Sequence, residues 1–198
     1  MSETPYQGPL LSADSHVVEP RDLWLTRMDV RWRDRAPRIE AIEGLGDSMI
    51  VEGLKPRPLA FEGPMIEFKA RGVEIPKITD FRYEDTRPGG WDPDARLKDQ
   101  DLDGVSGEVI YPGVGLFVCD TPDADYELAV CRTYNDWLAE FCAAHPTRLK
   151  GAALLPGKGP IEQIVAEAER AVGKLGLAAV MLPATNTAQP YNQPIWDG

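Results

Sequence analysis

The stretch Gly151-Ala152-Ala153-Leu154-Leu155-Pro156 decides the fold class, because it contains no polar side chain and therefore suits a strand that is buried on both faces. Two other short and almost wholly apolar runs, 108–112 and 177–183, also end in proline. Proline cannot donate a hydrogen bond to a strand ladder, so each proline is expected where a loop leaves the sheet. These three runs predict buried strands of a parallel sheet.

Helical patterns alternate with these strands along the chain. Residues 94–103 predict a helix, with Pro93 at its start and Gly104 just beyond its end. Residues 124–145 and 161–174 predict two more helices, the first of them long and amphipathic. An alternation of strands with helices of ten or more residues indicates right-handed βαβ units.

A loop-rich insertion is predicted at residues 20–90, which contain many prolines and no long helical period. Within it, 38–42 and 48–52 alternate in polarity around a turn at 44–47, and this pattern predicts a β-hairpin. Residues 54–84 carry four prolines and predict no regular element.

The size of the chain sets a limit on the fold. A further strand is expected before the insertion, which gives four strands in 198 residues. An eight-stranded (β/α) barrel usually needs about 250 residues. We therefore expect an α/β fold that forms the first half of such a barrel, with residues 1–198 as one partial barrel domain.

The composition excludes several classes of protein. The chain is 43% hydrophobic and 27% charged, which is typical of a globular protein, and its net charge of −11 argues against a nucleic-acid partner. No window approaches 18 uninterrupted apolar residues, and residues 1–5 lack the pattern of a secretory signal. We therefore expect a cytoplasmic protein with no membrane partner.

The three cysteines, Cys119, Cys131 and Cys142, are odd in number and lack CxxC spacing. Neither a disulfide framework nor a thiolate zinc site is indicated. We expect them to be buried and reduced.

The first strand carries Asp14-Ser15-His16, and it too is predicted to be buried. Residues two apart in a strand face the same way, so Asp14 and His16 are expected to converge and to share one metal ion. Glu19 follows closely and is a candidate for a further ligand or for a group that supports the ligands, although Glu-Pro before a helix is equally typical of a helix start. The other histidine, His145, stands near a helix end and is expected to be structural.

Three further segments are candidates for ligand binding. Arg87 and Trp91 lie in a Gly/Pro loop where a guanidinium could hold a carboxylate, with a surface turn as the alternative. Residues 99–104 begin like a calcium-binding loop, but its twelfth position is Ile110 where a Glu is required. Residues 157–159 lack the pattern of a phosphate-binding loop and predict an ordinary turn from strand to helix.

An ordered series of motifs resembles the amidohydrolase 2 family, which is related to aminocarboxymuconate semialdehyde decarboxylase. The motifs span nearly the whole chain and comprise Leu11-Ser12-Ala13-Asp14-Ser15-His16-Val17-Val18-Glu19-Pro20, Arg87-Pro88-Gly89-Gly90-Trp91-Asp92-Pro93, Asp101-Leu102-Asp103-Gly104-Val105, Tyr134-Asn135-Asp136-Trp137-Leu138, His145-Pro146-Thr147-Arg148-Leu149 and Tyr191-Asn192-Gln193-Pro194-Ile195-Trp196. The resemblance implies a metal-dependent barrel enzyme whose first strand supplies metal ligands. It also implies a further His from the fifth strand and an Asp from the eighth, neither of which matches a residue of this chain.

The first-strand motif departs from the family's name-giving decarboxylase, which has His-x-His where this chain has Asp14-Ser15-His16. The carboxylate-x-His form is similar to that of the resorcylate-type decarboxylases. The resemblance implies a decarboxylase or hydrolase for a small carboxylated organic substrate, with zinc as the expected metal and manganese as the alternative. A second hypothesis is a non-catalytic half barrel or one chain of a split enzyme, because the first and fourth strands would be open edges that recruit a second copy or a complementary half-barrel chain.

Overall fold

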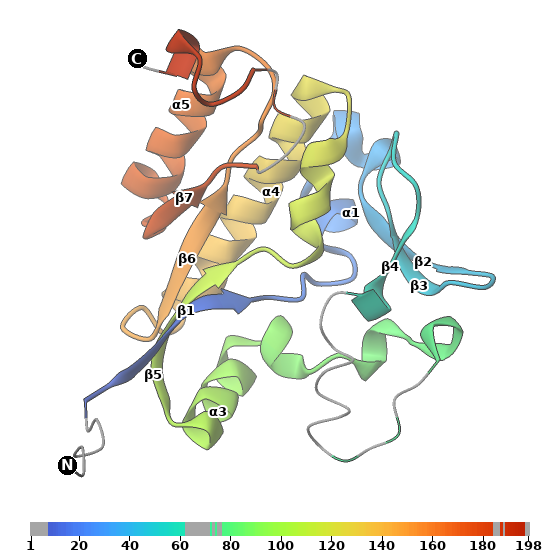
Figure 1. Ribbon diagram of the computed structural model, residues 1–198, viewed down its shortest axis with the longest axis vertical. Helices are drawn as coiled ribbons and strands as arrows, with labels where there is room; N and C mark the ends of the chain where they lie inside the picture. The colour runs from blue at the N-terminus through green and yellow to red at the C-terminus, as the bar shows by residue number, and fades with distance from the viewer. Residues whose placement is uncertain are drawn as a thin grey trace.

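Four parallel strands form the main sheet of the computed structural model (Figure 1). They lie in the order β1-β5-β6-β7 and comprise β1 Leu10–His16, β5 Val105–Tyr111, β6 Leu149–Leu154 and β7 Ala179–Met181. The structure describes residues 8–61, 72, 74, 77–183, 187 and 189–196. The order matches the succession of the predicted strands, so each neighbour pair is one βαβ step of a barrel.

The three predicted helices are present. They are α3 Pro93–Asp103, α4 Ala124–Ala143 and α5 Ile161–Glu169, the last of which continues as a π-helical turn, η7 Arg170–Lys174. The N-terminus of α3 is capped by Asp92, whose side chain accepts two backbone N–H bonds. Its C-terminus ends at Gly104 with φ of 69°, a left-handed conformation that favours glycine.

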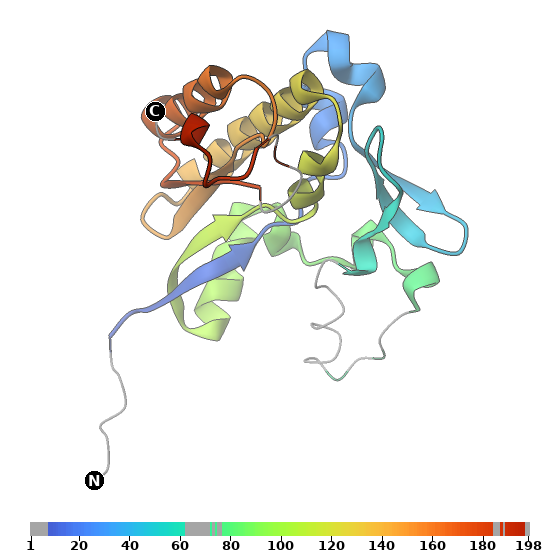
Figure 2. The ribbon, with the colours of Figure 1, turned by 45° about the horizontal axis from the view of Figure 1, so that its top comes forward.

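The insertion forms a second, antiparallel sheet of β2 Arg38–Ile42, β3 Gly46–Ile50 and β4 Arg57–Pro58. The predicted hairpin is confirmed, whereas β4 was not predicted. Figures 1 and 2 show this hairpin sheet on the side of the molecule opposite α5 and β7. The remaining elements are the helix α1 Leu23–Arg27 and the short helical turns η1 Val30–Arg35, η2 Leu59–Phe61, η3 Ile78–Asp80, η4 Tyr83–Asp85, η5 Pro88–Gly90, η6 Val114–Asp120 and η8 Pro194–Trp196. Two of the prolines in the segment without a predicted element, Pro64 and Pro76, lie outside the described residues.

The core is built around α4, which packs on β6 and on α1. Its apolar face buries Tyr134, Leu138 and Phe141, and the indole Nε1 of Trp24 donates to the Val130 carbonyl at 3.2 Å. Cys119, Cys131 and Cys142 are free and buried, as predicted. His145 also has a structural setting, because its Nε2 lies 2.7 Å from Asp94 and so links the end of α4 to the start of α3.

A buried carboxylate joins α4 to α5. Glu167 is fully buried and accepts hydrogen bonds from Arg132 and Arg170 at 2.8 Å and from Asn135 at 2.8 Å. These donors lower the pKa of Glu167 despite its burial. The Asn135 side chain also exchanges two hydrogen bonds with the backbone of Leu154, so the network fixes both helices on β6.

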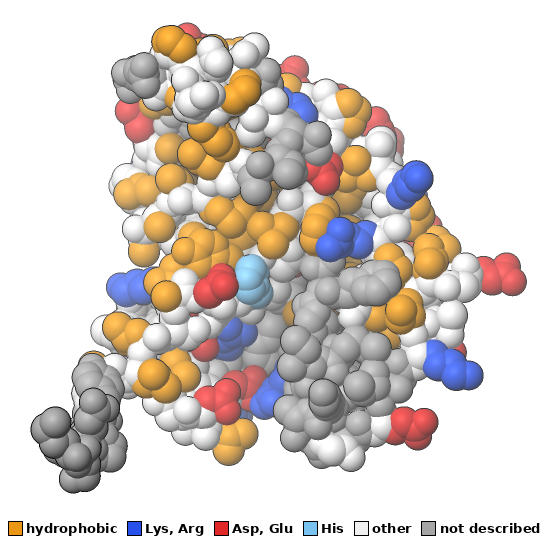
Figure 3. Space-filling view, in the orientation of Figure 1, with side chains coloured by type: hydrophobic (Ala, Val, Ile, Leu, Met, Phe, Trp, Pro, Cys, Tyr) orange, Lys and Arg blue, Asp and Glu red, His pale blue; other side chains and the backbone are white. Residues whose placement is uncertain are grey.

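The prediction that the strands are buried on both faces holds for β6, holds only in part for β5, where Gly107 and Ile110 are buried, and is wrong for β1 and β7. In β1, Leu10 is 53% and Leu11 67% exposed, and Val180 of β7 is 41% exposed. Within the described residues, β1 pairs only with β5 and β7 only with β6, so each strand has one open edge. Figure 3 shows hydrophobic side chains gathered across the middle of this face of the molecule.

Candidate functional site

His16 is the last residue of β1, so its side chain lies at the edge of the sheet where the loops leave the strands. Its Nδ1 lies 2.8 Å from the carbonyl oxygen of Pro112, the residue that follows β5. A carbonyl can only accept a hydrogen bond, so Nδ1 carries the proton and, in the neutral ring, Nε2 keeps its lone pair. The backbone of the neighbouring strand thereby selects the tautomer whose Nε2 can bind a metal.

Asp14 lies beside this nitrogen. Its Oδ1 is 3.5 Å from His16 Nε2, and the two side chains are 87% and 45% exposed. The pairing of β1 with β5 shifts register between Ser12 and Ser15, where β1 carries one extra residue opposite β5. The expected convergence of Asp14 and His16 is confirmed, and the pair presents one oxygen and one nitrogen donor to solvent.

A second contact holds the backbone of His16. Arg96 of α3 donates to the His16 carbonyl at 3.0 Å and forms an ion pair of 2.7 Å with Glu108 of β5. Both charged side chains are largely buried, with 14% and 9% exposure. Glu108 is a charged residue in an otherwise apolar strand, and this was the one sequence signal for the contact with Arg96. The sequence reasoning missed it.

Glu19 is fully buried and lies in a cradle of backbone N–H groups. Its Oε1 accepts from Gly113 and Gly115, and its Oε2 accepts from Val114, each at 3.0 Å. A Cβ atom at Gly115 would lie 2.8 Å from Glu19 Oε1, so the cradle requires glycine there. Burial raises the pKa of the carboxyl to about 7, although the three donors oppose the shift.

In this arrangement Glu19 holds the loop that follows β5. The carboxylate fixes the start of the loop that follows Pro112, and the Pro112 carbonyl in turn orients His16. Both carboxylate oxygens of Glu19 accept backbone hydrogen bonds, so its contact with the site runs through that loop.

The loop with Arg87 and Trp91 lies next to this site, because Val18 donates to the Gly90 carbonyl at 3.1 Å. The guanidinium of Arg87 forms an ion pair with Asp99 of α3. The Trp91 ring packs on Tyr83, with ring centroids 5.0 Å apart. The structure thus brings this loop to the site, with both side chains already engaged by the protein.

A group that the sequence reasoning missed lies in the loop after β6. Lys158 Nζ donates to the Cys119 carbonyl at 2.6 Å and lies 3.8 Å from Oε2 of Glu127, a fully buried residue of α4. Glu127 Oε1 accepts from the Gly157 N–H at 2.8 Å. Burial raises the pKa of Glu127 to about 7. No sequence motif marks this pair, because its members are 31 residues apart and Lys158 stands in a common Gly-Lys-Gly turn.

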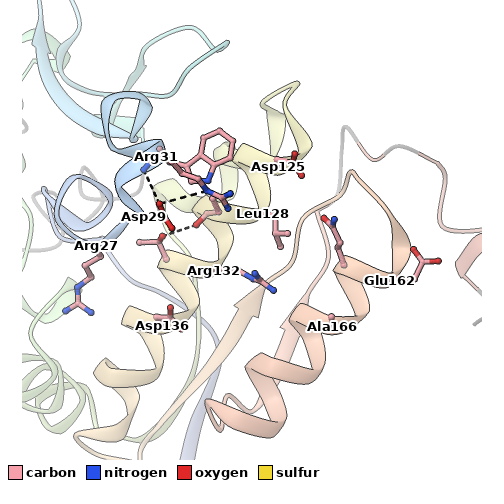
Figure 4. A pocket seen from close by; sticks show the side chains of 13 residues that line it. Arg27, Asp29, Arg31, Asp125, Leu128, Arg132, Asp136, Glu162 and Ala166 are labelled. Atoms are coloured by element: carbon pink, nitrogen blue, oxygen red, sulfur yellow. Dashed lines mark hydrogen bonds and ion pairs between the residues drawn. The ribbon is translucent and has the colours of Figure 1, made fainter.

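A cavity of about 630 Å³ lies elsewhere. It is formed by the outer faces of α4 and α5 and by the segment around η1, and its lining includes Arg31, Arg132, Asp136 and Glu162 (Figure 4). Its lining includes neither Asp14 nor His16, and no residue of the loops after β5, β6 and β7. We therefore assign the candidate site to the pair Asp14 and His16 and not to this cavity.

The donor set at the pair suits a divalent metal, because zinc and manganese both accept carboxylate oxygen and imidazole nitrogen. Within the described part of the chain, however, no three His, Cys, Asp or Glu side chains come together in a way that could hold a metal. The described residues therefore offer two ligands of such a site.

No helix in the described part of the chain is long and apolar enough to cross a membrane.

Comparison with known proteins agrees with the fold and with the motifs. The family model described as Amidohydrolase matches residues 16–196. An amidohydrolase from Mycobacterium avium subsp. paratuberculosis is similar in structure, with a TM-score of 0.63 and 19% identity over 89% of this chain and 50% of that chain.

Two decarboxylases are also similar in structure. The 5-carboxyvanillate decarboxylase from Novosphingobium aromaticivorans, complexed with manganese and 4-hydroxy-3-methoxy-5-nitrobenzoic acid, gives a TM-score of 0.57 and 17% identity over 96% of this chain and 46% of that one. The 2,6-dihydroxybenzoate decarboxylase from Rhizobium gives a TM-score of 0.52 and 18% identity over 96% of this chain and 45% of that one. The chain spans about half the length of these proteins, and the likeness shows a shared fold.

Proposed function

Because the chain belongs to the amidohydrolase family, we propose that it carries part of the metal site of an enzyme that decarboxylates or hydrolyses a small carboxylated organic molecule. The observation that carries the proposal is the orientation of His16, whose Nδ1 is engaged by Pro112 while Nε2 lies beside Asp14. Two structural neighbours are decarboxylases, and one of them was complexed with manganese.

Asp14 and His16 are the proposed ligands, with zinc or manganese as the metal. When bound, such a metal supplies Lewis acidity, which suits either the activation of water or the departure of carbon dioxide from a carboxylate. Pro112 and Arg96 hold His16 by its ring and by its carbonyl, so the ligand is oriented before the metal arrives. Glu19 is proposed to act by fixing the loop after Pro112.

Arg87 and Trp91 are proposed to contribute to substrate binding. The guanidinium would exchange Asp99 for a substrate carboxylate, which it can grip with two parallel hydrogen bonds. Trp91 would contact the substrate through the edge of its indole ring, which already packs on Tyr83.

The test is product analysis with the metal-loaded chain, using 2,6-dihydroxybenzoate and 5-carboxyvanillate as trial substrates. Release of carbon dioxide that disappears in His16→Ala supports decarboxylation. Hydrolytic turnover of trial esters or amides without carbon dioxide supports hydrolysis. A chain that binds metal and shows neither reaction would contradict the catalytic proposal and support the alternative below.

The alternative is a non-catalytic half barrel or one chain of a split enzyme, and the open edges favour it. Leu10 and Leu11 of β1 and Val180 of β7 are exposed apolar residues on strands with one partner among the described residues. Such edges recruit further strands. We expect self-association or capture of a complementary chain. A chain that is monomeric by light scattering and that unfolds cooperatively would contradict this alternative.

A further inference from the structure

The loops that leave the carboxyl ends of parallel strands form the ligand-binding edge of α/β sheets and barrels. In this chain the loops after β5, β6 and β7 include residues 112–123, 155–160 and 182–183 of the described part. Lys158 is the one Lys or Arg in those three segments. Lys158 is thus the positive charge that these three loops supply to an anionic ligand, beside Arg87 and Arg57 of the insertion, the second of which lies over the Phe117 ring of the loop after β5.

The ammonium group of Lys158 is held in place. It donates to the Cys119 carbonyl in η6, and its charge faces Glu127 Oε2 at 3.8 Å, which is longer than a hydrogen bond. An ammonium group has three N–H donors, so the single hydrogen bond within the described residues leaves two for another acceptor. The side chain is 19% exposed, which allows contact with a ligand while it limits competition from water.

Glu127 provides an independent sign that the cluster is incomplete. The residue is fully buried, and its Oε2 has no hydrogen-bond partner among the described residues. A buried carboxylate oxygen without a hydrogen bond is costly, and the charge nearest to Glu127 Oε2 is the Lys158 ammonium group at 3.8 Å. The negative charge of Glu127 thus favours a positive charge at the strand ends, where a ligand can reach it.

The spacing fits a small molecule. β6 is two strands from β1, and neighbouring strands lie about 4.8 Å apart, so the loop after β6 is about 10 Å across the sheet edge from His16. The hydrogen bond to Cys119 draws the Lys158 ammonium toward the segment that follows β5, which is the strand next to β1. This strand spacing is on the scale of a substituted benzoate, which makes such a molecule a suitable trial ligand.

We propose that Lys158 binds the anionic group of a small carboxylate ligand at this edge, and that Glu127 positions the loop that carries Lys158 by accepting from the Gly157 N–H. The inference deepens the proposed function and rests on it for the identity of the substrate class. Lys158 would supply charge recognition on the β6 side, opposite the pair Asp14 and His16.

The test compares binding of 2,6-dihydroxybenzoate with binding of the uncharged 2,6-dihydroxybenzamide, by titration calorimetry at about pH 8, where Glu127 is ionised. Lys158→Gln keeps a donor for the Cys119 carbonyl and removes the charge. We expect its affinity for the benzoate to fall about 10- to 100-fold, as for the loss of a charge-assisted hydrogen bond, with little change for the benzamide. Lys150→Gln, the same change at an exposed position on β6, should leave both affinities unchanged.

Glu127→Gln tests the charge of Glu127 while it keeps the side-chain oxygen that accepts from the Gly157 N–H and so holds the loop. Because this change removes the negative charge 3.8 Å from the Lys158 ammonium group, we expect benzoate binding to tighten. If the two residues only stabilise the fold, Glu127→Gln and Lys158→Gln should both weaken benzoate binding. Equal loss in both variants, equal benzoate affinity in Lys158→Gln and the unchanged chain, or no saturable benzoate binding would overturn the inference. The series is run on metal-free and manganese-loaded protein, so a failure to bind manganese counts against the metal site alone.

Discussion

Glu19 offers the sharpest test of how the loop after β5 is held. In Glu19→Ala, three buried backbone N–H groups lose their acceptor. Each unsatisfied buried donor costs about 1–3 kcal/mol, and removal of a buried carboxyl whose pKa is raised to about 7 offsets up to about 3 kcal/mol. We expect a net loss of about 3 kcal/mol in the free energy of unfolding, or about 6–12 °C in melting temperature for a chain of this size.

The assay is urea unfolding followed by tryptophan fluorescence, with two comparison variants. Glu19→Gln keeps one oxygen for two of the three donors, so we expect it to lose about 1 kcal/mol. Glu43→Ala changes an exposed glutamate on the hairpin and should stay within about 0.5 kcal/mol of the parent chain. If Glu19→Ala unfolds at the same urea concentration as Glu43→Ala, the backbone cradle does not stabilise the loop and the reasoning is refuted.

Two further variants test the packing and charge of the β6 region. Burial raises the folded-state pKa of Glu127 from 4.5 to about 7, so the folded chain binds this proton more tightly than the unfolded chain. The resulting stability is fully present below about pH 4.5 and is lost as pH rises through about 7; urea unfolding should show a decrease of up to about 3 kcal/mol that is absent in Glu127→Gln. A Cβ at Gly151 would lie 2.7 Å from Leu177 and 2.8 Å from Leu138, so Gly151→Ala should cost about 1–3 kcal/mol, and an unchanged melting temperature would show that the two leucines move aside freely.

The periodic elements could be predicted from sequence because their signals are local. The helix at 93–103 is framed by Pro93 and Gly104, and the hairpin by a turn rich in glycine. β4 could not be predicted, since it has two residues and includes Pro58. The exposure of β1 was also mispredicted, because burial depends on which strands lie beside it and not on its own residues.

The candidate site also has one part that the sequence predicts and another part that it does not. The spacing of Asp14 and His16 predicted that the two side chains meet, because alternation along a strand is a local property. The partners of His16 and Glu19 are 94–96 residues away in sequence and are backbone atoms, which carry no residue-type signal. The amidohydrolase resemblance that the motifs indicated is confirmed by the family match over residues 16–196.

The central claim is that Asp14 and His16 form a metal half-site with His16 Nε2 as the nitrogen donor. The most direct measurement is a titration of the metal-stripped chain with manganese and zinc, beside Asp14→Ala, His16→Ala and the control His145→Ala, which removes the histidine at the far end of α4. We predict stoichiometric binding that is lost in the first two variants and retained in His145→Ala. Equally weak binding by all four proteins would contradict the claim and leave the motif without a metal-binding function in this chain.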